Sequence, residues 1–235
     1  MSKINHYGKL VLFDLAGTLV TEKNEGGSLV ASSLSEAFSL SGFSVTGGQI
    51  RTIRGKEKKE GISELLKQLS NSETAVVEGT VQVIYTDFIR LIKDHLSDFA
   101  EIPGTAEVFR TLEKMNMAVG IGSGFPLKII KALIDFTGWK NQADIPYINS
   151  FENFPNGRPS PLMVFDFMRQ FNIKDPKNVL KVGDTTADMR EGKAAGCITV
   201  GVLSGAHDRK TIQAENPDYI LPDITYIPAL FQDLK

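Results

Sequence analysis

Cysteine is almost absent from this 235-residue chain. Cys197 stands alone, so no internal disulfide can form. The single cysteine and the three histidines form no cluster with metal-ligand spacing, which argues against a zinc site. No apolar run approaches the roughly 20 residues that a membrane-spanning helix needs. The opening residues lack a signal-peptide core and contain only a short apolar stretch at 10–13. The sequence therefore predicts a cytoplasmic protein with no membrane segment.

An excess of charge of either sign is also missing. The chain carries 26 Lys and Arg against 28 Asp and Glu, for a formal net charge of −2. This balance removes the usual electrostatic case for nucleic acid or an anionic membrane as the main partner. The composition, 42% hydrophobic and 23% charged, is typical of soluble globular proteins. A chain of this length can bury a large core without disulfides.

What is present is a repeating pattern of apolar runs of strand length, each followed by a turn signal and a helical pattern. The runs lie at residues 9–14, 117–124, 178–184 and 198–202. Helical patterns lie between the last three of these runs. Those at 126–136 and 161–171 follow the run at 117–124, and the one at 187–195 follows the run at 178–184. Continuous apolar runs suit strands buried on both faces of a parallel sheet. The alternation predicts an α/β fold with a doubly wound, Rossmann-like parallel sheet.

One stretch interrupts the alternation. Residues 26–100 contain no clear strand but show helical periodicity at 29–40, 62–69 and 76–96. This pattern predicts an all-helical domain inserted after the first strand, so that residues 1–22 and 101–235 form the core domain and 23–100 the insertion. The insertion begins just beyond the carboxyl end of the first strand, where ligands bind in open α/β sheets. We therefore expect a helical cap over an active site.

Polar residues end several of the predicted strands at the same edge of the sheet. Asp14, Ser123 and Asp184 each close an apolar run, and Asp188 follows one helical turn after Asp184. A turn or capping aspartate is the alternative for Asp14 alone, but the convergence of these groups favours a site. Clustered carboxylates repel one another unless a cation lies between them, and oxygen ligands at an open site favour magnesium. The sequence thus predicts a Mg²⁺ site.

Four segments in chain order resemble the motifs of the haloacid dehalogenase superfamily. They are DLAGTLV at 14–20, GSG at 122–124, GRPSP at 157–161 and GDTTADM at 183–189. The resemblance implies that Asp14 attacks phosphorus to form an aspartyl-phosphate, a step that needs charge neutralisation on the phosphoryl oxygens. It implies a Mg²⁺ ion held by Asp14, Asp184 and the backbone carbonyl of Ala16, with Asp188 orienting the metal site directly or through water.

The same resemblance implies how the phosphoryl group is bound. Ser123 and the backbone amide of Gly124 would donate hydrogen bonds to it, and Arg158 would supply a positive charge. Most phosphatases of the superfamily carry a second aspartate two residues after the nucleophile, where this chain has Ala16. A methyl group cannot protonate a leaving alkoxide. Alanine there together with GRP at 157–159 resembles the phosphonoacetaldehyde hydrolase branch, which cleaves a carbon–phosphorus bond.

In that branch a cap lysine condenses with the aldehyde, and the resulting iminium makes the leaving carbon an enamine. The loop GKEKKEGI at 55–62 aligns by its glycine and places Lys58 at this position. The sequence departs from the branch at Gly61, where the branch has histidine, and at Arg54, where it has methionine. These departures indicate a cap that recognises a substrate other than phosphonoacetaldehyde, of anionic character, with Arg54 as a candidate substrate-binding residue.

Three functions therefore remain open. The first is a Mg²⁺-dependent phosphonatase-type hydrolase acting on phosphonoacetaldehyde or a related small phosphonate. The second is a phosphate monoester phosphatase, with phosphoglycolate phosphatase as the nearest familiar activity. The third is a catalytically silent binding protein, supported by Ala16 alone. The resemblance also predicts cap movement about the linkers at 22–27 and 102–104, and it allows a homodimer, which the sequence does not fix.

Overall fold

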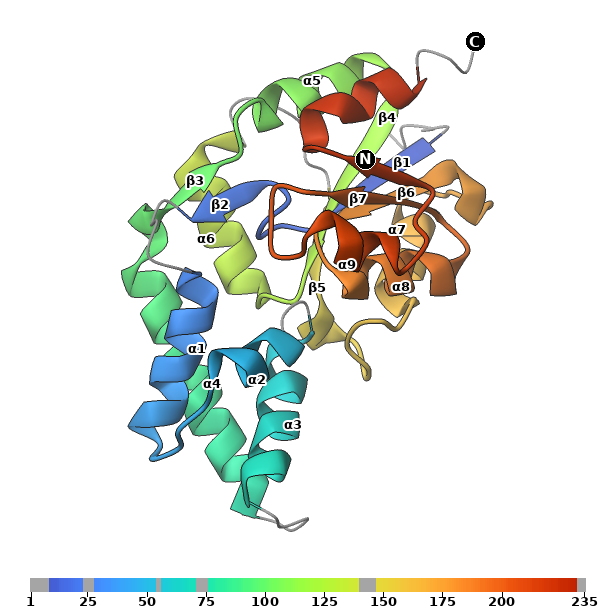
Figure 1. Ribbon diagram of the computed structural model, residues 1–235. Helices are drawn as coiled ribbons and strands as arrows, with labels where there is room; N and C mark the ends of the chain where they lie inside the picture. The colour runs from blue at the N-terminus through green and yellow to red at the C-terminus, as the bar shows by residue number, and fades with distance from the viewer. Residues whose placement is uncertain (1–8, 23–27, 54–55, 71–75, 140–146, 232–235) are drawn as a thin grey trace.

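A parallel sheet of six strands forms the centre of the computed structural model, which describes residues 9–22, 28–53, 56–70, 76–139 and 147–231 (Figure 1). The strand order is β5-β4-β1-β6-β7-β8 and every pairing is parallel. The strands are β1 (Lys9–Phe13), β4 (Met117–Ser123), β5 (Tyr147–Ser150), β6 (Val179–Gly183), β7 (Ile198–Val202) and β8 (Tyr219–Leu221). The predicted doubly wound α/β sheet is confirmed. The chain order reverses at β1, the usual place for a ligand site.

Helices cover both faces of the sheet, because alternate side chains of each strand point to opposite faces. Val11 and Phe13 of β1 pack with side chains of α5 (Thr105–Lys114) and α6 (Leu127–Thr137). Leu10 and Leu12 face the other way, toward α7 (Leu162–Gln170). The remaining core helices are α8 (Thr186–Ala195), which contacts β6 and β7, and the short α9 (Arg209–Gln213). Both faces of β1 are thus covered by apolar side chains, as its continuous apolar sequence predicts.

A separate group of four helices lies beyond the carboxyl edge of the sheet, at the lower left of Figure 1. It consists of α1 (Leu29–Leu40), α2 (Gly47–Thr52), α3 (Lys58–Ser70) and α4 (Val76–Asp94). α4 contacts both α1 and α3, and α1 also contacts α2. This group, here called the cap, is the all-helical insertion that the sequence predicts. The exact domain boundaries, 22/23 and 100/101, stay a prediction.

Two short strands tie the cap to the core. β2 (Val20–Glu22) pairs antiparallel with β3 (Phe99–Glu101), where the chain leaves and re-enters the core. Glu22 also reaches the first turn of α1, because its carboxylate accepts hydrogen bonds from the amides of Leu29 and Val30. A carboxylate at a helix N-terminus satisfies donors that have no partner within the helix. The cap helix α1 is therefore anchored to the linker strand.

The sequence did not predict several short elements. These are α2, α5, α9, β2, β3, β5 and β8, and the 3₁₀ helices Leu96–Asp98, Phe151–Asn153, Pro176–Asn178 and Ile224–Phe231. Strands of three or four residues are too short to show an alternation. α5 was detectable, because its buried residues Ala106, Phe109 and Leu112 follow helical spacing.

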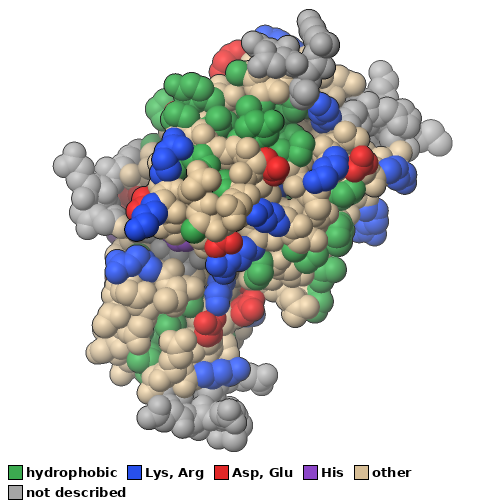
Figure 2. Space-filling view, turned by 45° about the vertical axis from the view of Figure 1, so that its right-hand side comes forward, with side chains coloured by type: hydrophobic (Ala, Val, Ile, Leu, Met, Phe, Trp, Pro, Cys, Tyr) green, Lys and Arg blue, Asp and Glu red, His purple; other side chains and the backbone are tan. Residues whose placement is uncertain are grey.

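The molecular surface agrees with the balanced composition. On the face shown in Figure 2, basic and acidic side chains are interspersed over both the core and the cap. Among the residues that the structure describes, no helix is long and apolar enough to cross a membrane.

Candidate active site

Three polar side chains lie at the carboxyl ends of adjacent strands. Asp14 follows β1, Ser123 ends β4 and Asp184 follows β6. Because β1 lies between β4 and β6, the three residues are neighbours at one edge of the sheet. The Asp14 amide donates to the Val182 carbonyl at 2.9 Å, which extends the pairing of β1 with β6 up to the site. All three side chains are buried. The structure thus brings together the strand-end residues that the sequence singled out.

The Asp184 carboxylate is held by two loops. Thr18 Oγ1 donates to Oδ1 at 3.2 Å, and the Ala206 amide donates to Oδ2 at 2.6 Å. Gly17, in the turn after β1, has a φ of +88°, and a Cβ there would lie 2.3 Å from Asp184 Oδ2. The turn therefore needs glycine both for its left-handed backbone and for the close approach of this carboxylate.

Asp188 is fully buried near the start of α8 and accepts from several donors. Lys181 Nζ lies 2.7 Å and Arg158 Nη1 3.1 Å from its Oδ1. Thr185 Oγ1 donates to Oδ2 at 2.6 Å, and the Thr185 amide donates to the same atom at 3.2 Å. Despite the desolvation that opposes ionisation, Arg158 and Lys181 hold the pKa of Asp188 at about 2. A carboxylate offers about four lone-pair sites. These donors approach all of them, which favours an indirect role at the metal.

The three carboxylates fit a divalent cation. Oxygen atoms of Asp14, Asp184 and Asp188 lie within 4.8 Å of one another, in the part of the chain that the structure describes. Arg158 and Lys181 offset part of the repulsion between these buried carboxylates, and a metal ion beside Asp14 and Asp184 would offset more of it. An all-oxygen donor set suits a hard ion. The cluster could therefore hold a divalent metal.

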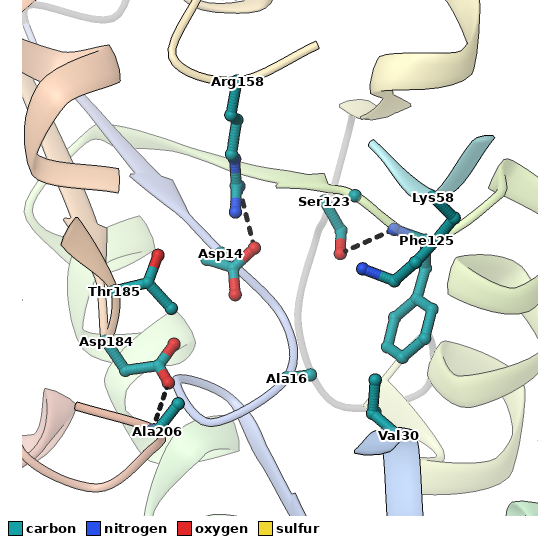
Figure 3. A pocket seen from close by; sticks show the side chains of 11 residues that line it. Asp14, Ala16, Val30, Lys58, Ser123, Phe125, Arg158, Asp184, Thr185 and Ala206 are labelled. Atoms are coloured by element: carbon teal, nitrogen blue, oxygen red, sulfur yellow. Dashed lines mark hydrogen bonds and ion pairs between the residues drawn. The ribbon is translucent and has the colours of Figure 1, made fainter. Parts of the chain in front are cut away.

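Arg158 reaches the site from the loop before α7 and is also buried. Its Nη2 lies 2.8 Å from Asp14 Oδ1 (Figure 3). The same nitrogen donates to the Gly122 carbonyl at 2.9 Å. Its Nη1 contacts Asp188, and its Nε lies 3.1 Å from Glu191 Oε2, although that pair lacks hydrogen-bond geometry. Burial opposes the charge, but the three carboxylates raise the Arg158 pKa above its usual value. The guanidinium is therefore a permanent cation beside Asp14.

The charge state of Asp14 depends on what surrounds it. Burial raises the pKa of Asp14, the Arg158 charge opposes this shift, and the Asp188 charge adds to it. A carboxylate must be ionised to act as a nucleophile. Additional positive charge at the site would favour the ionised form. A metal ion next to Asp14 would therefore add to the effect of Arg158 and favour the ionised carboxylate.

The cap contributes Lys58 to the same cavity. The cavity, of about 40 Å³, is lined by Asp14, Ser123, Gly124 and Arg158 from the core and by Val30 and Lys58 from the cap. Figure 3 shows the Lys58 ammonium directed into the space between Ser123 and the Phe125 ring. Lys58 is buried, its Nζ donates to the Lys56 carbonyl at 3.2 Å, and it lies 5.6 Å from the Phe125 ring centre. The cap lysine that the sequence singled out therefore faces the core aspartate.

The two departures in the cap loop have different outcomes. Arg54 lies outside the described residues. Gly61 lies in the first turn of α3, and a Cβ there would meet Ile53 Cβ at 3.0 Å. Ile53 is buried and fills the space beside this glycine. A histidine at 61 would need Ile53 to move, so the absence of histidine goes with a specific packing of the cap.

Cap and core also meet around Phe125 and Glu152. The Phe88 ring of α4 stacks against Phe125, with ring centres 6.3 Å apart. Tyr85 of α4 donates to Glu152 Oε2 at 3.3 Å, and the other oxygen of Glu152 accepts from the Leu127 amide at 2.9 Å. Glu152 thereby links a cap helix to the start of core helix α6. The cap is docked over the site in this conformation.

Sequence reasoning missed the residues that support the site from behind. Lys181 and Glu191 are fully buried. Lys181 contacts Asp188 and Glu191, and Glu191 also contacts Arg158. Lys181 carried a detectable signal, because a lysine inside an apolar strand run is seldom buried without a charged partner. Glu191 carried none, since acidic residues on helices are usually exposed. Cys197 is buried, and burial raises its pKa to about 12, so it is not a reactive thiol.

A comparison with known families identifies the class of protein. The sequence model of the haloacid dehalogenase-like hydrolase family matches residues 9–196 of this chain. The chain therefore belongs to the haloacid dehalogenase-like hydrolase family, and it is an enzyme, a hydrolase. The resemblance that the four motifs carry is confirmed.

Individual relatives narrow the comparison further. Phosphonoacetaldehyde hydrolase from Latilactobacillus sakei is 27% identical, in an alignment that covers 94% of this chain and 93% of that protein. The crystal structure of a phosphonoacetaldehyde hydrolase-like protein from Oleispira antarctica has a TM-score of 0.79 at 20% identity, covering 97% of this chain and 92% of that one. A predicted phosphoglycolate phosphatase from Haemophilus somnus has a TM-score of 0.75 at 22% identity, with coverages of 95% and 98%. The two structures share the fold.

The close approach of Gly17 to Asp184 predicts a selective effect of Gly17→Ala. We expect turnover to fall about 100-fold, the loss typical of a displacement of about 1 Å in a reacting group. The matched control is Gly42→Ala in the cap, where φ is +82° but nothing lies within 4 Å of the new Cβ. Both variants should lose about 1 kcal/mol of stability in urea unfolding from the strained backbone, and Gly17→Ala should lose more because its Cβ also meets Asp184. Equal turnover by the two variants would contradict the inference that glycine at position 17 is needed to place the Asp184 carboxylate.

Proposed function

We propose that this protein is a Mg²⁺-dependent phosphonatase that cleaves the carbon–phosphorus bond of phosphonoacetaldehyde or a close analogue through an aspartyl-phosphate on Asp14. One observation carries the proposal: Lys58 of the cap and Asp14 of the core line one small cavity that also contains Ala16. An amine in this place supplies the activation that phosphate ester hydrolysis would obtain from an acid at position 16.

The first step belongs to Lys58. Its neutral amine adds to the aldehyde carbon, and loss of water from the adduct gives an imine that is protonated on nitrogen. The side chain is confined between the Phe125 ring and the Lys56 carbonyl, so the aldehyde is held near the core. The iminium can accept the electron pair of the carbon–phosphorus bond. The leaving carbon becomes part of an enamine, and no acid at position 16 is required.

The second step belongs to Asp14. Its carboxylate attacks phosphorus, the carbon–phosphorus bond breaks and its electron pair enters the enamine. Ser123 Oγ, the Gly124 amide and the Arg158 guanidinium line the cavity and bind the phosphoryl oxygens. Asp14, Asp184 and the Ala16 carbonyl would hold Mg²⁺, with Asp188 in support, and the bound ion would supply neutralisation of charge on the phosphoryl group.

Water completes the cycle. The enamine takes a proton on carbon, and hydrolysis of the imine frees acetaldehyde and the Lys58 amine. A second water hydrolyses the aspartyl-phosphate to phosphate and restores Asp14. Since imine formation releases one water, the net reaction consumes one water for each acetaldehyde and phosphate formed. No redox partner is needed.

The cavity between cap and core is small in this conformation, about 40 Å³. Admission of substrate then requires the cap, proposed as residues 23–100, to move away from the core, proposed as 1–22 and 101–235. The linkers near β2 and β3 are the proposed hinges.

A phosphate monoester phosphatase is the second candidate. The observation that favours it is the packing of Ile53 against Gly61, because the phosphonatase branch has a histidine at this position. In that case Lys58 acts as a cation for an anionic leaving group such as the carboxylate of phosphoglycolate. A homodimer stays a prediction.

The test is an assay of the purified protein with Mg²⁺ and phosphonoacetaldehyde, in which acetaldehyde and phosphate are both measured. We expect equal amounts of the two products at a rate ordinary for an enzyme. Phosphoglycolate is assayed in parallel. Phosphate from phosphoglycolate without acetaldehyde from phosphonoacetaldehyde would replace the proposal by the phosphatase candidate.

A further inference from the structure

Two fully buried charged residues, Lys181 of β6 and Glu191 of α8, lie behind the site. Neither lines the cavity that the reacting groups share. Lys181 Nζ is 2.7 Å from Asp188 Oδ1 and 3.4 Å from Glu191 Oε2. Arg158 contacts the same two carboxylates, Asp188 through Nη1 and Glu191 through Nε, each at 3.1 Å. Two cations and two carboxylates thus alternate around a closed, buried ring of contacts.

Stability alone does not account for this ring. Removing charges from water is costly, and a buried ion pair often stabilises a fold no better than apolar side chains of the same volume would. In addition, neither carboxylate oxygen of Glu191 nor Arg158 Nε has a hydrogen-bond partner among the described residues. An arrangement of this kind is better explained by the geometry that it imposes on its neighbours.

The contacts of Arg158 determine which nitrogen of its guanidinium faces Asp14. The guanidinium of Arg158 is planar, and its three nitrogens form a rigid fork. The carboxylates of Glu191 and Asp188 each lie 3.1 Å from one nitrogen of this fork, Nε and Nη1, as ion pairs. The third nitrogen, Nη2, faces Asp14 Oδ1 at 2.8 Å (Figure 3) and also donates to the Gly122 carbonyl at 2.9 Å. The ammonium of Lys181 lies between the two carboxylates that hold Arg158, and offsets their repulsion.

The packing of α8 on β6 fixes the ammonium in turn. A Cβ at Gly192 would lie 3.0 Å from Lys181 Cβ and 2.7 Å from Thr199 Cγ2. The glycine therefore lets α8 approach the strand closely and encloses the stem of Lys181. Any displacement of this lysine would have to move a helix or a central strand.

We propose that Lys181 and Glu191 are positioning residues that aim the Arg158 guanidinium at the phosphoryl site. They act through Arg158 and touch neither substrate nor the reacting atoms. The consequence for catalysis rests on the function proposed above, whereas the orientation of Arg158 does not. The two parts can therefore fail separately.

The orientation is tested by NMR on ¹⁵N-labelled protein. The Arg158 Nε–H signal is assigned by its loss in Arg158→Lys. We expect Glu191→Gln, which keeps the shape but not the charge, to shift this signal and speed its exchange with water. Lys181→Met should do the same. The matched control is Glu215→Gln, since Glu215 pairs with Arg190 at the surface of α8 and should move only the Arg190 signal.

The catalytic consequence is tested by a double-mutant cycle. Glu191→Gln should lower kcat about tenfold or more with a change in KM of less than about threefold, since an orienting contact matters most in the transition state. In an Arg158→Lys background the same change should cost less than about threefold, because the guanidinium it acts through is gone. Glu191→Asp, which keeps the charge, should recover part of kcat. Urea unfolding of each variant separates a loss of stability from a loss of turnover.

Two results would overturn the proposal. One is an Arg158 signal that stays unchanged in Glu191→Gln. The other is an equal loss of kcat from this substitution in both backgrounds, which would indicate a structural effect independent of Arg158. If Lys181→Met does not fold, Glu191→Gln decides alone. A wild-type enzyme inactive on both substrates, with Arg158 shifts as expected, would reject the proposed function and leave the orientation standing.

Discussion

Asp14→Asn should abolish turnover, with a loss of about 10⁴-fold or more, as expected when a covalent nucleophile is removed. The amide is nearly the same shape as the carboxylate but is a poor nucleophile and a weak metal ligand. Arg158 keeps its contacts with Asp188 and Glu191, so the fold should survive. The measurement is the rate of phosphate release, with circular dichroism and urea unfolding to confirm that the variant is folded.

The control for this experiment is Asp94→Asn. Asp94 ends α4 in the cap, has an exposed side chain and lies 3.8 Å from Arg90. It should lose no activity, because an exposed ion pair contributes little. Beryllofluoride, which mimics a phosphoryl group on a carboxylate, should bind wild type and Asp94→Asn but not Asp14→Asn. Activity above a few per cent in folded Asp14→Asn would refute the nucleophile assignment.

The sequence predicted the sheet core and the cap for a physical reason. Strands buried on both faces must be apolar throughout, so β1, β4, β6 and β7 stand out as continuous runs. Their order along the chain, with helices between them, limits the topologies available. The edge strands β5 and β8 are short and lie at the two ends of the sheet, and their sequences carry no comparable signal.

The site was predicted as far as local motifs extend. Asp14, Ser123 and Asp184 end neighbouring strands, so their proximity follows from the topology. The ring behind Arg158 does not follow, because Glu191 is on a helix whose buried face cannot be read from its charge. Arg158 itself was identified by its motif, but its contacts with three carboxylates depend on tertiary packing.

Whether the enzyme cleaves a carbon–phosphorus bond or a phosphate ester is decided by Lys58. Lys58→Ala should lower acetaldehyde release by about 10³-fold or more, since no other group described in the cavity offers an amine. Lys58→Arg should not restore activity, because a guanidinium stays protonated and forms no imine. Borohydride added during turnover should leave an ethyl group on Lys58, detectable by peptide mass spectrometry.

The neighbouring lysine provides the control. Lys56→Ala removes a cation from the same loop, but the Lys56 side chain pairs with Glu64 and points its charge elsewhere. It should keep most of the acetaldehyde release and the borohydride label on Lys58. If Lys58→Ala instead keeps full activity on phosphoglycolate and no label forms in wild type, then Lys58 is not an imine former. The missing acid at Ala16 would then have to be supplied by the substrate or by another group of the cap, as the phosphatase candidate requires.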